Sequence, residues 1–258
     1  MHQVSYRELP ADQVKSLFAD DPPVPVRLWA ILDQGIASSI LVDDRQQPTL
    51  AFVQELAEHT VYIGGQPTAQ SLAEGIDVLR RETEVVVCDW QGGKLAELLP
   101  EDPDYQGMAI DFTDRSEQVD LREFAQAPAG LELRRIRRDD IPLLQGYDYY
   151  LRMYGAEELA VARTIGYCLI HEGTVISEAV AGPFAHGVAE IGVGTRVEFQ
   201  RRGLGTLTAA RAIQACESLG YQAFWNSAAQ NSASIALARR LGFQKEDPFL
   251  VFVWSKRG

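Results

Sequence analysis

Residues 190–206 read EIGVGTRVEFQRRGLGT and join three local patterns. The first part predicts a strand, because apolar Ile191 and Val193 alternate with glycines. A basic, glycine-bearing turn follows, and a helical pattern then runs from Thr206 to Leu219. The first amides of such a helix lack partners and lie at the positive end of its dipole. The junction therefore predicts a binding site for an anion.

Gly203 and Gly205 lie in this turn, where the absence of side chains would let a phosphate reach the helix amides. The alternative is an ordinary surface turn that contains two glycines. A P-loop is excluded, because no Gly-x-x-x-x-Gly-Lys-Ser/Thr occurs in the chain. A dinucleotide-binding fingerprint is disfavoured, because Thr208 occupies the place of its third glycine. The turn therefore needs support from the rest of the chain.

Residues 223–254 provide that support. A short apolar strand at 223–225 precedes a helix that ends near Gly242, and a final strand is expected at 249–254. The helical segment reads Asn231-x-x-Ser234-x-x-Leu237-Ala238-x-x-Leu241-Gly242-Phe243. Together with Gln200-x-x-Gly203-x-Gly205, this pattern resembles the signature of the GCN5-related N-acetyltransferases (GNAT), in the same order and at the same spacing.

The resemblance implies the GNAT fold for the second half, an α/β (α+β) arrangement with a mixed, mostly antiparallel sheet flanked by helices. It also implies acetyl-coenzyme A (acetyl-CoA) as the acyl donor, with its pyrophosphate on the glycine turn. The residues expected to contact the donor are Val193, Gly194, Thr195, Gln200, Arg201, Arg202, Gly203, Leu204, Gly205, Thr206, Asn231 and Ser234. For the two arginines, a solvated basic surface is the alternative.

The first half resembles the leading domain of two-domain acetyltransferases more faintly, from Trp29 through Val42-Asp43-Asp44 to Pro48. We expect a smaller α/β domain at residues 1–128, a degenerate GNAT-like copy that forms one wall of the substrate cleft. The catalytic domain is expected at residues 129–258. Helices are expected at 9–20, 26–42 and 68–81, and strands at 39–42, 49–53, 61–65, 85–88, 131–136, 164–171, 175–181 and 188–196.

Acetylation of an amine needs a base for the amine and a donor for the thioester carbonyl oxygen. In the family, the base is often a carboxylate on the strand before the glycine turn, which ranks Glu190 first and Glu178, on the preceding strand, second. Glu190 could instead face solvent or pair with an arginine. His171 and His186 rank lower because they lie near strand ends. Backbone amides near Val193 are expected to bind the pantetheine arm and polarise the thioester, because a splayed strand leaves them free.

The chain departs from the family in its last helix, where Ala238 occupies the position of a common tyrosine. No general acid is assigned, since a coenzyme A thiol is acidic enough to leave as the anion (reference thiol pKa about 8.5). Further upstream, Tyr147, Tyr149, Tyr150 and Tyr154 form an aromatic cluster. It either lines the acceptor pocket or packs a helix on the sheet.

The chain has 258 residues and a net charge of −12, which is unevenly distributed. Residues 1–130 carry 9 Lys/Arg against 23 Asp/Glu, and residues 131–258 carry 15 against 13. The acidic half is compatible with a cationic amine substrate, although such a surface also keeps a protein soluble. The sequence shows no basic stripe for nucleic acid, no metal-ligand spacing, and no apolar run of about 18 residues for a membrane.

Cys88, Cys168 and Cys216 lie in apolar surroundings, so we expect reduced core thiols in a cytoplasmic protein without a signal peptide. The expected function is acetyl-CoA-dependent N-acetylation of a primary amine of a small molecule, such as a metabolite or an amine-bearing antibiotic. The alternative is a non-catalytic sensor or scaffold that binds acetyl-CoA. O-acetylation and transfer of a longer acyl group also stay open. A homodimer through edge strands is compatible with the fold.

Overall fold

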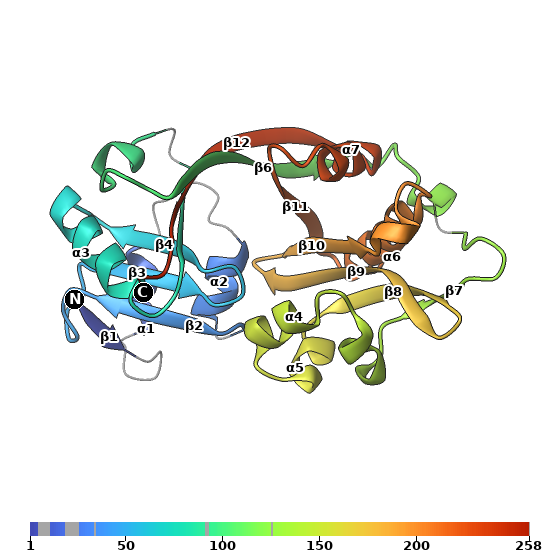
Figure 1. The fold of residues 1–258 in the computed structure, drawn as a ribbon, viewed down its shortest axis with the longest axis horizontal. Coiled ribbons are helices and arrows are strands. Elements are labelled where there is room, and N and C mark those ends of the chain that lie inside the picture. The colour runs from blue at the N-terminus through green and yellow to red at the C-terminus, as the bar shows by residue number, and fades with distance from the viewer. Residues whose placement is uncertain (5–10, 19–25, 34, 91–92, 125, 258) are drawn as a thin grey trace. The chain divides into compact units, whose positions relative to one another are not determined.

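The structure of the chain is a computed structural model, which describes residues 1–4, 11–18, 26–33, 35–90, 93–124 and 126–257. The chain folds into two compact units. The first contains residues 1–109 and 248–258, and the second contains residues 110–247. The chain passes from the first unit to the second along β6 (Tyr105–Arg115) and returns along β12 (Phe243–Trp254), as Figure 1 shows.

The first unit is built on a sheet with the strand order β1-β2-β3-β4-β5-β12. Its elements before β6 are β1 (His2–Val4), α1 (Ala11–Ser16), α2 (Val26–Leu32), β2 (Ser38–Val42), β3 (Leu50–Glu55), β4 (Thr60–Gly65), α3 (Ala69–Leu79), β5 (Val85–Asp89) and the 3-10 helix η2 (Ala96–Leu98). Neighbouring strands are antiparallel except for β4 and β5, which are parallel. The core lies where Leu72 and Ile76 of α3 pack with Phe52 and Val87 of the sheet.

The helix expected over residues 26–42 is shorter than predicted. It ends at Leu32, and the Gly35 amide then donates to the Ala30 carbonyl at 2.6 Å, which turns the chain away. Residues 38–42 pair with β3. The strand expected there is confirmed, and the helix prediction was wrong because a short apolar run fits both periods. Of the helix expected at 9–20, residues 11–16 are helical, whereas residues 9, 10, 19 and 20 lie outside the described residues.

The second unit has the strand order β6-β11-β10-β9-β8-β7. Its elements after β6 are η3 (Leu121–Phe124), β7 (Glu132–Arg135), η4 (Arg138–Leu143), α4 (Tyr147–Tyr154), α5 (Glu157–Ala162), β8 (Ile165–His171), β9 (Thr174–Ala185), β10 (Val188–Thr195), η5 (Val197–Phe199), α6 (Leu204–Glu217), β11 (Gln222–Ala228) and α7 (Ser232–Arg240). Figure 1 shows α4 and α5 on one face of β8–β10 and α6 on the other. Ala209 and Ile213 of α6 pack with Ala179 and Ile191, and these small strand residues let the helix lie close to the sheet. The predicted mixed sheet flanked by helices is confirmed.

The two units repeat one topology. In each, three antiparallel strands (β2–β4 and β8–β10) lead into a helix (α3 and α6). The strand after that helix (β5 and β11) then lies parallel to the third strand. The first half therefore has the arrangement expected of a degenerate copy of the same fold.

The boundaries between the two compact units lie after residues 109 and 247, whereas a single boundary was expected after residue 128. Residues 110–128 belong to the second unit, because Phe112 and Leu121 are part of its core. Residues 248–258 belong to the first unit, because residues 250–254 pair with β5. A single linear boundary cannot include a strand that returns from the far end of the chain. The assignment of separate functions to residues 1–128 and 129–258 stays a prediction.

Candidate active site

Strands β10 and β11 separate at the candidate site. They pair in parallel from Val188 and Gln222 to Glu190 and Phe224, and the pairing ends there although both strands continue. From residue 191 onward, no strand of the described chain pairs with the β11-facing side of β10. Backbone groups on such an edge bind solvent or a ligand. The separation of strands expected around Val193 is therefore present.

The glycine turn leads directly into α6. Gly203 is the N-cap residue and has a φ of 77°, in the left-handed region that glycine adopts without steric cost. No side chain among the described residues caps this helix, so its first amides are available to another partner. The helix begins at Leu204, slightly earlier than expected, and its 14 residues give it a full dipole. The geometry is that of an anion site.

A groove of about 590 Å³ lies between the end of β10, the glycine turn and α7. Among the residues expected to contact acetyl-CoA, the groove is lined by Val193, Thr195, Gln200, Arg201, Gly203, Leu204, Gly205, Thr206, Asn231 and Ser234. Gly194 lies in the adjoining backbone. Arg202 turns away, since its Nη2 donates to the Glu198 carbonyl at 3.1 Å and its guanidinium lies 5.3 Å from the centre of the Phe199 ring. The structure thus gathers two distant motifs around one groove.

Other residues that line the groove were not predicted from the sequence, namely Phe199, Trp225, Ala233, Ala236, Leu237 and Arg240. Leu237 was detectable, because it lies one helical turn after Ser234 and therefore on the same face of α7. Phe199 and Trp225 carry no comparable spacing signal, since a large apolar residue near a strand end is more often part of the core.

Several predicted contact residues also hold the groove in shape. The Gln200 side chain donates from Nε2 to the Thr195 carbonyl at 3.1 Å, which closes the turn onto the end of β10. Asn231 Oδ1 accepts from the Ser234 amide at 3.1 Å and so caps α7. Ser234 Oγ accepts from Trp225 Nε1 at 3.0 Å, which fixes α7 to β11. Both walls of the groove are therefore tied to the sheet.

Glu190 lies where the β10–β11 pairing ends. The β9–β10 ladder is irregular between Ala189 and Ile191, where β9 has one extra residue opposite Glu190. The Glu190 residue is only 8% exposed, which excludes the alternative of a carboxylate on the solvent side. The position of Glu190 beside the separating strands suits the base that the sequence analysis predicts, and this role stays a prediction.

Glu178 is engaged elsewhere. It is 2% exposed, and its Oε2 and Oε1 accept from the backbone amides of Gln145 and Gly146, both at 2.9 Å. Burial raises the pKa of Glu178, although the hydrogen bonds from these two amides act in the opposite direction. A carboxylate with both oxygens bonded in this way holds the segment before α4 against β9. The structure thus gives Glu178 a structural role, and its role as the second candidate base stays a prediction.

The face of β10 that lies away from α6 is open near Gly192. A methyl group on Gly194 would lie 3.4 Å from Glu178 Cγ and 3.5 Å from Gln145 Nε2. At Gly192, the nearest described atom to such a methyl group would be the Val180 carbonyl oxygen, at 4.0 Å. This face of β10 therefore has open space beside Gly192, opposite the groove on the α6 side.

The tyrosine cluster on α4 divides between the two expected roles. Tyr150 and Tyr154 are buried and pack the helix on the sheet, and burial raises the pKa of Tyr150 well above its usual value. Tyr149 lies edge-on to Tyr150, with ring centres 5.5 Å apart. Tyr147 is partly exposed, and its hydroxyl donates to Glu157 Oε1 at 3.1 Å. Packing therefore explains the inner pair.

The remaining candidates lie away from the groove lining. Ala238 is fully buried in the core of the second unit, and it supplies no proton donor. His171 lies edge-on to Phe199 with ring centres 5.9 Å apart, and His186 is in the turn between β9 and β10 with a φ of 49°. Among the described residues, no group of His, Cys, Asp and Glu side chains could hold a metal ion.

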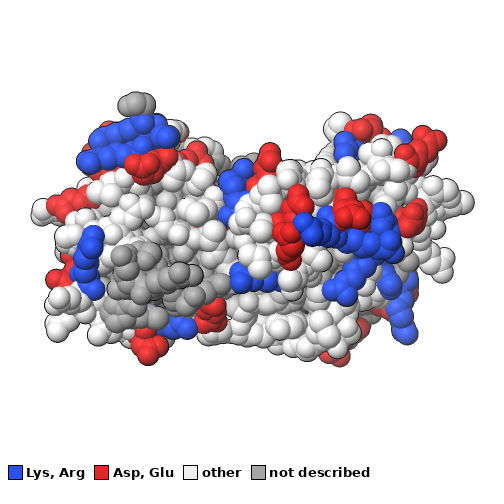
Figure 2. Space-filling view, turned by 90° about the horizontal axis from the view of Figure 1, so that it is seen from below, with Lys and Arg blue, Asp and Glu red and all other residues white. Residues whose placement is uncertain are grey.

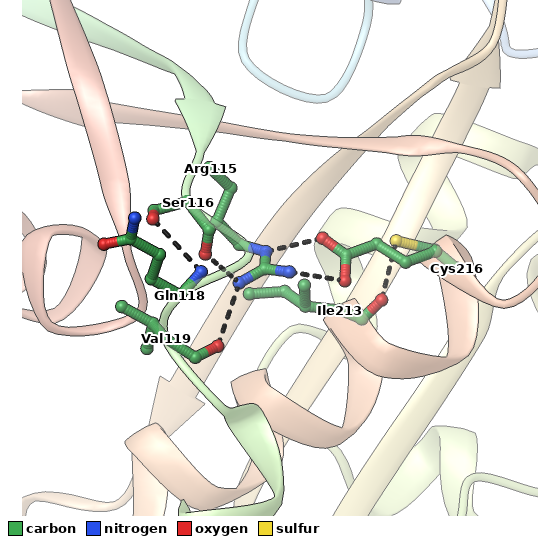
Figure 3. A network of polar contacts seen from close by, with 7 residues as sticks. Arg115, Ser116, Gln118, Val119, Ile213 and Cys216 are labelled. Atoms are coloured by element: carbon green, nitrogen blue, oxygen red, sulfur yellow. Dashed lines mark hydrogen bonds and ion pairs between the residues drawn. The ribbon is translucent and has the colours of Figure 1, made fainter.

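A second cavity, of about 900 Å³, lies in the same unit near the end of α6 and the start of β11. Arg115 lies in its wall and donates to Glu217 from Nε at 2.5 Å and from Nη2 at 2.8 Å (Figure 3). Its Nη1 donates to the carbonyls of Ser116 and Val119. All three guanidinium nitrogens are engaged, so this arginine fastens α6 to the segment after β6.

The cysteines are thiols in the structure. All three lie in the described ranges, and none of them forms a disulfide. Burial raises the pKa of Cys168 and of Cys216 to about 12, and Cys216 Sγ donates to the Ile213 carbonyl at 3.2 Å (Figure 3). Such thiols are poor nucleophiles at neutral pH. The helices of the described chain include none that is long and apolar enough to cross a bilayer.

Charge is mixed on the surface that Figure 2 shows, where basic and acidic side chains are interspersed. Ion pairs in the second unit join arginines to carboxylates. Arg134 Nη2 lies 2.6 Å from Asp140 Oδ1, and Arg138 pairs with Glu158.

The repeated α/β topology, the separated parallel strands and the glycine turn at a helix start are together those of the GNAT fold. The family comparison agrees with this architecture, since the model of the GNAT acetyltransferase family matches residues 17–252. The chain therefore belongs to the GNAT acetyltransferase family.

Similar proteins include an uncharacterised N-acetyltransferase, YdfB, from Bacillus subtilis (strain 168), which is 26% identical over 249 residues, 93% of this chain and 94% of the relative. A GCN5-related N-acetyltransferase-like protein from Streptococcus suis 89/1591 superposes with a TM-score of 0.70 at 21% identity, over 94% of this chain and 98% of the other. A tandem GNAT protein from the clavulanic acid biosynthesis pathway superposes with a TM-score of 0.60 at 13% identity, over 96% of this chain and 95% of the other. These structural likenesses show the fold.

Proposed function

We propose that the protein is an enzyme that transfers an acetyl group from acetyl-CoA to a primary amine of a small molecule. The observation that carries this proposal is the groove in which the separated end of β10 meets the uncapped first turn of α6. Family membership supports the reaction class. The acidic composition of residues 1–130 supports a cationic acceptor.

The residues present fit such a donor. Gly203 leaves open space at the turn, where an added Cβ would have no described atom within 4 Å. At Gly205 an added Cβ would lie 3.2 Å from Thr195 Oγ1 and 3.4 Å from Val193 Cγ1, and would fill the cradle in front of the helix amides. Arg201 and Arg240 line the same groove and add positive charge for phosphates. Leu237 and Trp225 supply apolar walls.

Acetyl-CoA would supply the acyl group as an activated thioester. The backbone of β10 around Val193 would orient the chain of the donor and polarise its carbonyl, because its edge is unpaired after residue 190. Glu190 would accept the proton that the attacking amine nitrogen releases as the new C–N bond forms and the C–S bond breaks, directly or through water. With Ala238 in the last helix, the sulfur would leave as the thiolate.

Two measurements test the proposal. Calorimetry measures the binding of acetyl-CoA, and release of free thiol is followed with a panel of primary amines. Glu190→Gln should lower kcat by about 100-fold or more with the Kd for acetyl-CoA unchanged, because only proton transfer is lost. Glu198→Gln, an exposed carboxylate near the turn, is the matched control and should keep full activity.

The outcomes separate the enzyme from a sensor or scaffold. Thiol release that depends on an amine supports the enzyme, and binding without release from any acceptor supports the non-catalytic alternative. Unchanged turnover in Glu190→Gln would remove Glu190 as the base. An absence of acetyl-CoA binding would overturn the proposal.

A further inference from the structure

Three hydroxyl side chains meet where β9, β10 and α6 come together. Ser177 Oγ lies 2.8 Å from Thr195 Oγ1 and 3.2 Å from Thr208 Oγ1. Ser177 and Thr208 are completely buried. Hydroxyls inside a helix–sheet interface cost free energy unless they are hydrogen-bonded, and the alanines around them show that apolar residues suit this interface. The cluster therefore calls for a functional explanation.

Thr195 connects the cluster to the candidate site. It lines the groove beside the glycine turn, whereas Ser177 and Thr208 lie beneath it. A Cβ at Gly205 would lie 3.2 Å from Thr195 Oγ1, so the glycine leaves space for this hydroxyl as well as for a ligand. Gly205 occupies the second position of α6, where the backbone amide is one of those that lack a helical partner. The Thr195 hydroxyl and the helix amides are thus close together.

The protons of the cluster can be assigned from its geometry. Each hydroxyl donates one hydrogen bond and can accept two. Thr208 Oγ1 lies 3.3 Å from the carbonyl oxygens of Leu204 and Gly205, which uses its proton inside α6. The Ser177 proton can go to the Gly194 carbonyl at 3.2 Å or to Thr195 Oγ1 at the shorter distance of 2.8 Å. When it goes to Thr195, the Thr195 proton is left for an oxygen atom in the groove.

We propose that Ser177 is a positioning residue that turns the Thr195 hydroxyl into a hydrogen-bond donor for a phosphate oxygen of the groove ligand. The proposal rests on the proposed function, because it takes acetyl-CoA as that ligand. An anionic oxygen is a stronger acceptor than the Ser177 hydroxyl, so the bound ligand selects this arrangement of protons. Ser177 touches no ligand and acts only through Thr195.

The test is a double-mutant cycle on the Kd for acetyl-CoA, measured by calorimetry with Ser177→Ala, Thr195→Val and the double variant. Thr195→Val should weaken binding about tenfold, the loss of one hydrogen bond to a charged group. Ser177→Ala should weaken it about threefold to fivefold in the wild-type background and leave it unchanged in the Thr195→Val background. Ser227→Ala is the matched control, a buried serine on β11 that bonds to its neighbouring Ala228 carbonyl, and should bind as the wild type does.

Each outcome of the double-mutant cycle either supports or overturns the proposed role of Ser177. Equal losses from Ser177→Ala in both backgrounds would show a general packing effect and overturn the proposal, as would no loss in either. Inorganic pyrophosphate serves as a second probe in the same cycle. If acetyl-CoA fails to bind the wild type while pyrophosphate binds with the same coupling, the proposed function falls and the role of Ser177 stands. If neither probe binds, both fall.

Discussion

The two units contain the same opening between parallel strands and fill it differently. In the first unit β4 and β5 pair only at Thr60–Val86 and Val61–Val87 within the described chain. In the second, β10 and β11 part after Glu190. A helix begins after the third strand in both cases, α3 in one and α6 in the other. The topology therefore creates the opening twice.

In the first unit, the polar groups at this opening are bonded to residues of the chain itself. At the start of α3, Thr68 Oγ1 accepts from the Ser71 amide at 3.2 Å, and Ser71 Oγ accepts from the Thr68 amide at 2.9 Å. The Gly65 amide donates to the Leu17 carbonyl at 3.0 Å, and the Phe18 ring lies against Gly64. The groove of about 830 Å³ that remains nearby lies beside a helix start that is already capped.

The second unit leaves the corresponding groups available. Gly203 supplies no capping side chain, and the β11-facing side of β10 has no strand partner from residue 191 in the described chain. Both units have the opening of the fold, and they differ in a few cap and turn residues at the start of the helix. Four experiments test how far the two units differ in the binding of an anion and in stability.

The largest expected effect comes from placing a carboxylate at each helix start. Gly205→Glu should weaken acetyl-CoA binding by about 100-fold, or about 2.7 kcal/mol, because the new charge and its Cβ occupy the cradle. Ala69→Glu, in the first turn of α3, should leave binding unchanged. Calorimetry measures both. If Ala69→Glu were the variant that loses binding, the donor would lie in the first unit.

The second largest difference is expected between the ion pairs near the C-terminal ends of α6 and α3, in how much each contributes to the free energy of unfolding. Arg115→Ala should lower the free energy of unfolding by about 2 kcal/mol, because the Arg115 side chain is 10% exposed and its loss removes the two hydrogen bonds to the Glu217 carboxylate and the one to the Val119 carbonyl. Arg81 pairs with Asp77 at the end of α3, but it is 64% exposed, and Arg81→Ala should have no measurable effect. Urea unfolding of both variants makes the comparison. Equal losses of unfolding free energy in the two variants would contradict this expected difference.

Removing the N-cap of α3 tests whether the cap alone prevents the first unit from binding acetyl-CoA. Thr68→Ala should lower the free energy of unfolding by about 1 kcal/mol through loss of the capping bond. It should create no second acetyl-CoA site, because the Gly65 amide stays bonded to the Leu17 carbonyl and the Phe18 ring still lies against Gly64. Denaturant unfolding gives the first quantity, and calorimetric stoichiometry gives the second. Binding of an additional acetyl-CoA per chain would show that the cap alone excludes the ligand.

The smallest effect concerns pH and a buried glutamate in each unit. Burial raises the pKa of Glu55 and of Glu178 above the usual 4.5. Each carboxylate also accepts hydrogen bonds from two backbone amides, which act in the opposite direction. A raised pKa in the folded state means that the stabilisation is present below pH 4.5 and is lost as pH rises through the folded-state value. Glu55→Gln and Glu178→Gln should each flatten the fall in unfolding free energy above pH 4.5. If the unfolding free energy of the variants depended on pH as that of the wild type does, the raised pKa values of the two glutamates would be contradicted.

The sequence was most informative where its signals are local. Residues 190–206 contain a strand, a left-handed glycine and a helix start within one short stretch, so each signal confirms its neighbour. The second motif was added through its resemblance to the GNAT signature, from Asn231 to Phe243. The helix expected over 26–42 failed because its apolar residues also suit a strand, and only pairing with β3 decided between them.

Long-range contacts could not be predicted. Glu178 bonds to amides 32 and 33 residues away, and Ser177 meets hydroxyls 18 and 31 residues away. A buried polar residue on a strand gives no sign of its partner until the fold brings them together. The same holds for Leu17, which directly follows α1 and whose carbonyl accepts a hydrogen bond from the Gly65 amide.

The return of β12 to the first unit has a consequence for biosynthesis. Residues 250–254 form the strand beside β5, yet the ribosome makes them only after residues 110–247. At ordinary elongation rates that interval lasts roughly 7–28 s. Throughout it the nascent first unit exposes the β5 edge, which is a template for wrong strand pairing. The second unit is continuous in sequence, so it can fold before the unit that precedes it is complete.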